Sequence, residues 1–175
     1  LEINVSERLG QIVEATCGSL GQGLSVAAGV CLTAKRRNKR YRSYVILGDG
    51  ELQEGQTWEA AMFASSNELS NLCLIVDLNQ LQVEGHTDKV IKMKPIDEKF
   101  QAFGWNAISV DGHSFEDLDR AFNLARNETK KPTVIIAKTI VGKGVPFLEG
   151  KMSHNMVLPA HVAENALEKL GGSLD

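Results

Sequence analysis

Long apolar runs are missing from this sequence: no stretch approaches the roughly eighteen residues that a membrane-spanning helix needs. No charged and then apolar leader opens it, and it has no low-complexity segment. Charge of one sign is not in excess either, because 19 Lys and Arg nearly balance 22 Asp and Glu, for a net charge of -3. We therefore expect neither a membrane protein nor a nucleic-acid-binding protein.

Cysteine is scarce and is not arranged in pairs. Cys17, Cys31 and Cys73 are an odd number with no Cys-x-x-Cys spacing, and two of them lie in apolar segments. This pattern is typical of a reduced protein, so we expect a cytoplasmic location.

Length and composition predict a single domain. The 175 residues, of which 43% are hydrophobic, are enough for one domain with a substantial core. The sequence opens at Leu1 and not at methionine, which leaves open that the domain over residues 1–175 lacks an N-terminal segment. The basic run at residues 35–40 is a local exception in charge, and we predict that it caps the end of the preceding helix.

Strand-like and helix-like segments alternate along the chain. Strands are predicted at 44–47, 72–77, 105–110 and 133–137, and helices at 24–34, 55–66, 96–103, 114–127 and 159–170. Ser114, with Asp117 three residues later, predicts the start of one helix. Residues 139–158 are predicted to form a loop over the strand ends. This alternation predicts an α/β fold, a parallel sheet with helices on both faces.

Polar residues follow two of the predicted strands. Gly48, Asp49 and Gly50 come directly after strand 44–47, and Asn79 comes just after strand 72–77. Because the carboxyl ends of parallel strands share one edge of the sheet, we expect these residues to meet. The glycines permit close approach of a phosphate, and Asp49 offers a carboxylate to a hard cation.

A magnesium-diphosphate site explains these residue types. Mg²⁺ takes about six oxygens and often shares its shell with phosphates. The Asp49 carboxylate, the Asn79 amide oxygen and a backbone carbonyl near Leu81 would supply the protein ligands. A tight turn after a strand remains an alternative for the Gly-Asp-Gly tripeptide taken alone.

Two other phosphate-binding motifs do not match. A dinucleotide fingerprint requires a third glycine, but Gln53 stands in its place, and Asp49 would face the pyrophosphate. A Walker loop requires Ser or Thr after its lysine, but Lys143 is followed by Gly144.

These blocks resemble a known family. Residues 48–55, followed by Asp77, Leu78 and Asn79, resemble the thiamine-diphosphate motif of transketolases. Residues 16–23 resemble the transketolase glycine loop, and residues 131–139 resemble a later strand of the same domain. The likeness covers nearly the whole chain and points to the N-terminal, thiamine-diphosphate-binding subunit of a two-chain bacterial-type transketolase. It implies a three-layer thiamine-diphosphate-binding fold.

The resemblance also implies roles for particular residues. Those implied to bind the cofactor are Gly18, Gly48, Asp49, Gly50, Glu51 and Asn79. Those implied to hold Mg²⁺ or Ca²⁺ are Asp49, Asn79 and Leu81. Acids at a helix start give Glu51 an alternative, purely structural explanation.

Three further positions carry family roles or departures from them. His154 resembles a histidine that contacts substrate near the reacting carbon, although Ser153 and Asn155 break the family's Trp-His-Gly pattern. Cys17 stands where the family usually has Thr, and Glu54 resembles a glutamate at the subunit interface.

The function implied by the resemblance is transfer of a two-carbon ketol unit between a ketose and an aldose phosphate. In the family a glutamate from a separate pyrimidine-binding domain completes the site, and no match for that domain is found here. A C-terminal transketolase-type subunit is therefore expected as partner, in an α₂β₂ heterotetramer. Another thiamine-diphosphate enzyme subunit, loading two-carbon units or resembling a dehydrogenase component, and a non-catalytic cofactor-binding subunit remain alternatives.

Overall fold

A four-stranded parallel sheet forms the centre of the computed structural model, which describes residues 13–153 and 157–172. The strand order is β1-β2-β6-β5, and all three neighbouring pairs are parallel. The strands are β1 (Ser43–Gly48), β2 (Leu72–Leu78), β5 (Asn106–Asp111) and β6 (Thr133–Lys138). The predicted parallel sheet is therefore confirmed, and the strand bounds agree to within one residue.

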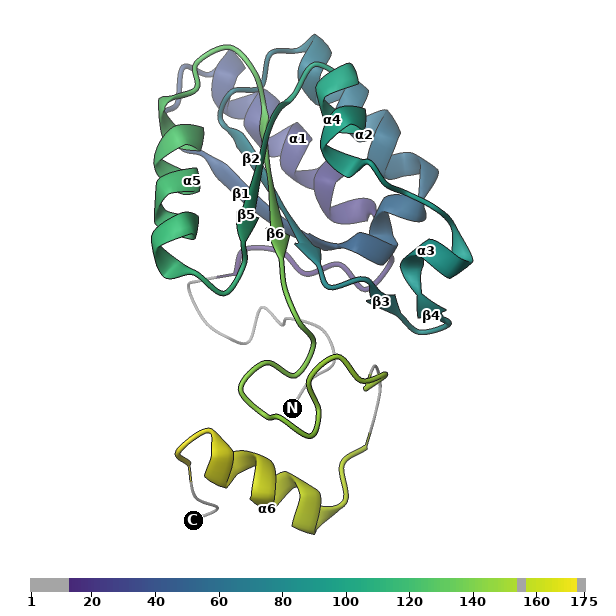
Figure 1. Ribbon diagram of the computed structural model, residues 1–175. Helices are drawn as coiled ribbons and strands as arrows, with labels where there is room; N and C mark the ends of the chain where they lie inside the picture. Colours follow the sequence, from purple (N-terminus) through teal and green to yellow (C-terminus); the bar gives the residue numbers. More distant parts are fainter. Residues whose placement is uncertain (1–12, 154–156, 173–175) are drawn as a thin grey trace.

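Helices cover both faces of the sheet (Figure 1). On one face lie α1 (Gln22–Arg36), α2 (Gly55–Ser66) and α4 (Ile96–Ala102), and on the other lies α5 (Phe115–Asn127). The hydroxyl of Ser114 accepts a hydrogen bond from the Asp117 N–H at 3.2 Å, as the sequence predicts for this helix start. The last helix, α6 (Ala160–Lys169), lies beyond the strand ends (Figure 1). Within the described part of the chain, no helix has the length and apolar character to cross a membrane.

Short elements next to the strand ends were not predicted. They are the 3₁₀ helix η2 (Asp49–Gln53), the hairpin strands β3 (Leu81–Gln82) and β4 (Gly85–His86), and helix α3 (Thr87–Val90). Two-residue strands have no hydrophobic period to detect. Contacts distant in sequence hold them instead: the Gln53 side-chain amide donates to Gln82 Oε1 at 2.7 Å, joining η2 to the hairpin.

The core lies on both sides of the two central strands. Leu74 and Val76 of β2 and Val134 and Ile135 of β6 are fully buried. Strands covered on both faces are continuously apolar, which explains why these runs could be recognised. Cys73 is also buried, as expected, and burial raises the pKa of its thiol to about 11, which keeps it protonated.

Strand β1 is less covered than its neighbours. It forms one edge of the described sheet, with Leu47 buried on the side of α1. On the opposite side Tyr44 and Ile46 are 47% and 73% exposed, and the ring of Phe122 in α5 packs against Tyr44. An apolar strip along one sheet edge therefore faces solvent in the described chain.

Glycine at position 21 permits α1 and α2 to approach closely. Gly21 has φ 79°, and a Cβ there would lie 2.9 Å from Glu54 Cβ and 2.9 Å from Thr57 Oγ1. Gly29, in the middle of the same helix, has open space where a Cβ would be. Of these two glycines, only Gly21 is required by the packing.

We therefore expect Gly21→Ala to lower the free energy of unfolding by about 1–3 kcal/mol, because of backbone strain and overpacking. Gly29→Ala is the matched control and should raise it by up to about 1 kcal/mol, the helix preference of Ala over Gly. Urea unfolding followed by circular dichroism measures both. Equal stability of the two variants would contradict the close approach.

Candidate functional site

Asp49 lies where β1 ends and η2 begins, and only 2% of its surface is exposed. Its Oδ2 accepts hydrogen bonds from the Gln80 N–H at 3.0 Å and from the Thr87 hydroxyl at 3.1 Å. Its Oδ1 is buried and has no hydrogen-bond partner within the described residues. An unpaired buried carboxylate oxygen is costly, and a cation is the partner that would satisfy it.

The electrostatic surroundings of Asp49 agree with this interpretation. Burial, the largest cause, raises the pKa of its carboxyl, and the charge of Asp77 acts in the same direction. Hydrogen bonds from Thr87 and Gln80 oppose the rise but do not cancel it. A divalent cation beside Oδ1 would favour the ionised carboxylate and reverse the shift.

Asn79 adjoins Asp49 at the end of the neighbouring strand. Strands β1 and β2 are in register, with Gly48 opposite Asp77. The Asn79 Oδ1 accepts from the Leu81 N–H at 2.9 Å, and a carbonyl oxygen has a second lone pair to offer. The Asp49 carboxylate accepts from the Gln80 N–H in the same turn. Both predicted ligand side chains therefore contact the backbone of residues 80–81.

Leu81 and Gly50 are placed around the same turn. Leu81 begins β3 and pairs with His86 of β4, so the hairpin fixes its backbone. A Cβ on Gly50 would lie 3.3 Å from Gln82 Cβ, which explains why glycine suits this close approach of η2 and hairpin. The use of the Leu81 carbonyl as a metal ligand stays a prediction.

Glu51 connects the glycine loop to the turn after β1. Its Oε2 accepts from the Gly21 N–H at 2.8 Å, and its Oε1 accepts from the Gly48 N–H at 3.1 Å. Both carboxylate oxygens therefore hold backbone amides, one at the start of α1 and one at the end of β1. The sequence alone did not indicate this link, and a direct contact of Glu51 with a cofactor stays a prediction.

The other predicted residues are distributed as follows. Gly48 has open space within 4 Å of where a Cβ would be, which leaves its backbone accessible. Gly18 and Cys17 are exposed in the glycine loop, and Glu54 is exposed just before α2. His154 lies outside the described residues.

Three residues at the site were not singled out from sequence. Thr87 donates to Asp49, and Thr139 donates to Asp77, whose other oxygen accepts from Asn79. Asp77 belongs to the quoted Asp-Leu-Asn motif, so its presence was visible but its role was not. No local pattern marks Thr87 or Thr139, because tertiary structure alone brings them to the strand ends.

The donor set suits a hard cation that shares its shell with a ligand. No group of three or more His, Cys, Asp or Glu side chains that could hold a metal ion occurs in the described ranges. One carboxylate and one amide oxygen at a strand edge instead leave several positions for phosphate oxygens.

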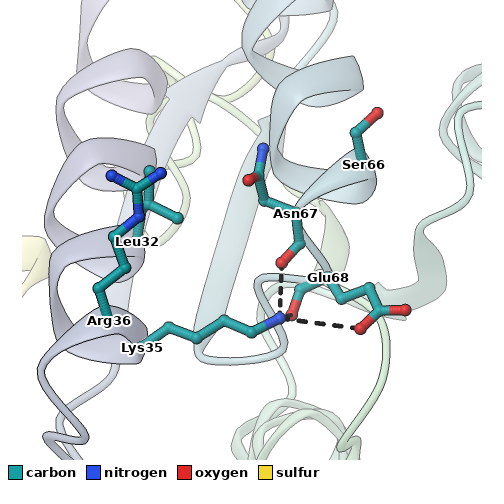
Figure 2. Close-up of a pocket in the computed structure, with 6 residues that line it drawn as sticks. All are labelled: Leu32, Lys35, Arg36, Ser66, Asn67 and Glu68. Carbon is teal, nitrogen blue, oxygen red and sulfur yellow. Dashed lines mark hydrogen bonds and ion pairs between the residues drawn. The ribbon is translucent and has the colours of Figure 1, made fainter.

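A surface pocket elsewhere has a different character (Figure 2). It lies at the C-terminal ends of α1 and α2, where Lys35 Nζ donates to the carbonyls of Asn67 at 2.7 Å and Glu68 at 3.3 Å. As predicted for the basic run, Lys35 and Arg36 lie in the last turn of their own helix α1. Lys35 also stabilises the end of the neighbouring helix. Because the Lys35 ammonium group already binds backbone carbonyls, the charge in this pocket has a structural explanation.

Comparison with known proteins identifies the family of this chain. Residues 6–173 match the family model described as "Transketolase, thiamine diphosphate binding domain". One subunit of a 6-deoxy-6-sulfo-D-fructose transketolase from Clostridium sp. is 41% identical over 159 residues, covering 90% of this chain and 58% of that protein. One subunit of an apulose-4-phosphate transketolase from Phocaeicola vulgatus is 37% identical, covering 93% of this chain and 58% of that protein.

Longer proteins named simply as transketolases are also similar. The human enzyme is 44% identical over 159 residues, with 90% of this chain and 25% of the human protein covered. The crystal structure of transketolase from Campylobacter jejuni superposes with a TM-score of 0.83 at 34% identity, covering 92% of this chain and 26% of that one. The chain thus spans little more than half the length of the two subunits and about a quarter of the length of the other two transketolases.

The fold and the family model together define a parallel α/β domain of the thiamine-diphosphate-binding class. The chain belongs to the transketolase family, as its thiamine-diphosphate-binding domain.

The raised pKa of Asp49 predicts a pH dependence of stability. The folded chain holds a proton on Asp49 more tightly than the unfolded chain does, so stability decreases as pH rises from the unfolded pKa through the folded one. Without added cation, Asp49→Asn should therefore remove this decrease and raise the free energy of unfolding at pH 7 by about 1 kcal/mol. Urea unfolding at several pH values measures this, with the exposed Asp119→Asn as control. A parallel pH profile for wild type and Asp49→Asn would contradict the assignment.

Proposed function

We propose that this chain holds thiamine diphosphate through a divalent cation, Mg²⁺ or Ca²⁺, as the diphosphate-binding subunit of a transketolase. The observation that supports this most directly is the buried, unpartnered Oδ1 of Asp49 beside the Asn79 turn, in a chain of this family. The complete enzyme transfers a two-carbon ketol unit between a ketose and an aldose phosphate, in the cytoplasm.

Each site residue has a distinct task in this proposal. Asp49 and Asn79 hold the cation, and the Leu81 carbonyl completes the protein ligands. Gly48 and Gly50 permit the diphosphate to approach the backbone. Glu51 fixes the glycine loop, with Gly18, against the turn after β1 through its two amide contacts. When bound, thiamine diphosphate supplies the electron sink that carbon–carbon cleavage requires.

A second chain completes the enzyme. The two subunit-type relatives are named as subunits of transketolases, and this chain covers 58% of each. We infer a C-terminal transketolase-type partner that carries the pyrimidine-binding domain, in an α₂β₂ assembly. His154 serves there as the contact to substrate, and Glu54 lies in the subunit interface.

Cofactor binding should depend on the two proposed cation ligands. We expect Asp49→Ala to abolish Mg²⁺-dependent binding of thiamine diphosphate, because the ion loses its carboxylate, and Asn79→Leu to weaken it at least about tenfold. Titration calorimetry with and without Mg²⁺ measures this, and Glu98→Ala, at an exposed position in the first turn of α4, is the control. Wild-type affinity in Asp49→Ala would refute the cation site.

Turnover should require the partner chain. The purified 175-residue chain is expected to show no ketol transfer with ketose phosphate donors, and activity should appear when a co-purifying transketolase-type chain is added. Mass spectrometry of complexes isolated from the native source identifies that chain. Full activity of the chain alone would overturn the divided-site proposal while leaving cofactor binding intact.

A further inference from the structure

We propose that Asp77 is a positioning residue that orients the Asn79 amide toward the cation, and that Thr139 holds Asp77 in place for this task. The inference rests on the proposed cation site and adds to it two residues that are not among the proposed ligands. The three side chains come from the ends of the two central strands, β2 and β6.

The orientation of the Asn79 amide follows from its hydrogen bonds. Its Nδ2 donates to Asp77 Oδ2 at 3.0 Å, and its Oδ1 accepts from the Leu81 N–H at 2.9 Å. An amide nitrogen cannot bind a cation, so the side chain is useful as a ligand only with its oxygen turned toward the ion. A carboxylate accepts but does not donate, and Asp77 therefore selects the productive orientation of Asn79.

Thr139 in turn fixes Asp77. The Thr139 hydroxyl donates to Asp77 Oδ1, so both oxygens of this carboxylate are engaged. The Thr139 N–H also donates to the Leu78 carbonyl at 3.2 Å, which joins the end of β6 to the end of β2. With both oxygens held, Asp77 presents one fixed oxygen to the amide.

Thr139 also begins the segment that follows β6. The next N–H, of Ile140, donates to His113 Nε2 at 2.8 Å, which holds the segment to the end of β5. Asp77 thus connects a cation ligand with the start of residues 139–153. Binding of the cation should slow hydrogen exchange at the Thr139 amide, because it fixes the Asn79, Asp77 and Thr139 contacts together.

Two substitutions separate orientation from charge. Asp77→Asn is nearly isosteric. If the oxygen of the new asparagine accepts from the Thr139 hydroxyl, its NH₂ group faces Asn79. That NH₂ group favours the reversed orientation of the Asn79 amide, with the Asn79 oxygen turned away from the cation. This substitution also removes a negative charge near the ion. Thr139→Val keeps that charge and removes only the hydroxyl donor, and Thr139→Ser retains the donor.

The experiment measures binding of Mn²⁺, as a probe, to the full 175-residue chain in saturating thiamine diphosphate by electron paramagnetic resonance. We expect the dissociation constant to rise about 10–100-fold in Asp77→Asn, about tenfold in Thr139→Val, and less than about twofold in Thr139→Ser, in line with typical outer-shell substitutions. Asp111→Asn is the matched control, since Asp111 ends β5 and its carboxylate accepts from the His113 N–H at 2.9 Å. Its affinity should equal that of wild type.

Several results would overturn the inference. Wild-type Mn²⁺ affinity in Asp77→Asn or Thr139→Val, with unchanged melting temperature, would show that Asp77 and Thr139 do not set the orientation of the Asn79 amide. An equal loss in Asp111→Asn would show that general charge at the strand ends is responsible. If wild type itself binds no Mn²⁺ with thiamine diphosphate, the proposed function fails as well, so the two failures are distinguishable.

Discussion

The buried carboxylate of Asp49 is the constraint on which the arrangement of the strand ends depends. One of its oxygens is held by the Gln80 N–H and the Thr87 hydroxyl, and the other has no partner in the described chain. This division requires β1 to lie beside β2, and it requires the hairpin and α3 to return Thr87 to the end of β1. The short elements around the sheet edge thus fix the Asp49 side chain through Oδ2 and leave Oδ1 without a partner among the described residues.

In our proposal, the site accepts a cation, and the empty site has a cost in stability. Burial disfavours the ionised form of Asp49, and the nearby charge of Asp77 adds to this. Binding of a cation to the folded chain alone would offset the cost, so occupancy and stability are thermodynamically linked. The start of α1, by contrast, is held by the chain's own groups, because the Gly21 N–H donates to Glu51. The two halves of the site therefore differ in how far they depend on ligand.

Much of this architecture is visible in the sequence, for reasons that can be named. The run 72–76 is apolar without alternation because β2 is buried on both faces, and the helix predicted at 55–66 is observed with the same bounds. Asp49 and Asn79 were predictable as neighbours because parallel strands place their carboxyl ends on one edge. Thr87 and Thr139 were not, because their roles arise from contacts 38 and 62 residues away in sequence. Glu51 was ambiguous for a similar reason: an acid after a strand looks the same whether its carboxylate meets solvent, ligand or a distant amide.

The exposed side of β1 has a consequence for handling the protein. Ile46 is 73% exposed on a strand whose outer edge is unpaired within the described sheet. Unpaired backbone groups beside an apolar strip form a template onto which another extended chain can add. Concentrated preparations of this chain by itself will therefore tend toward oligomers joined edge to edge, and a charged substituent on that strip would improve its colloidal behaviour.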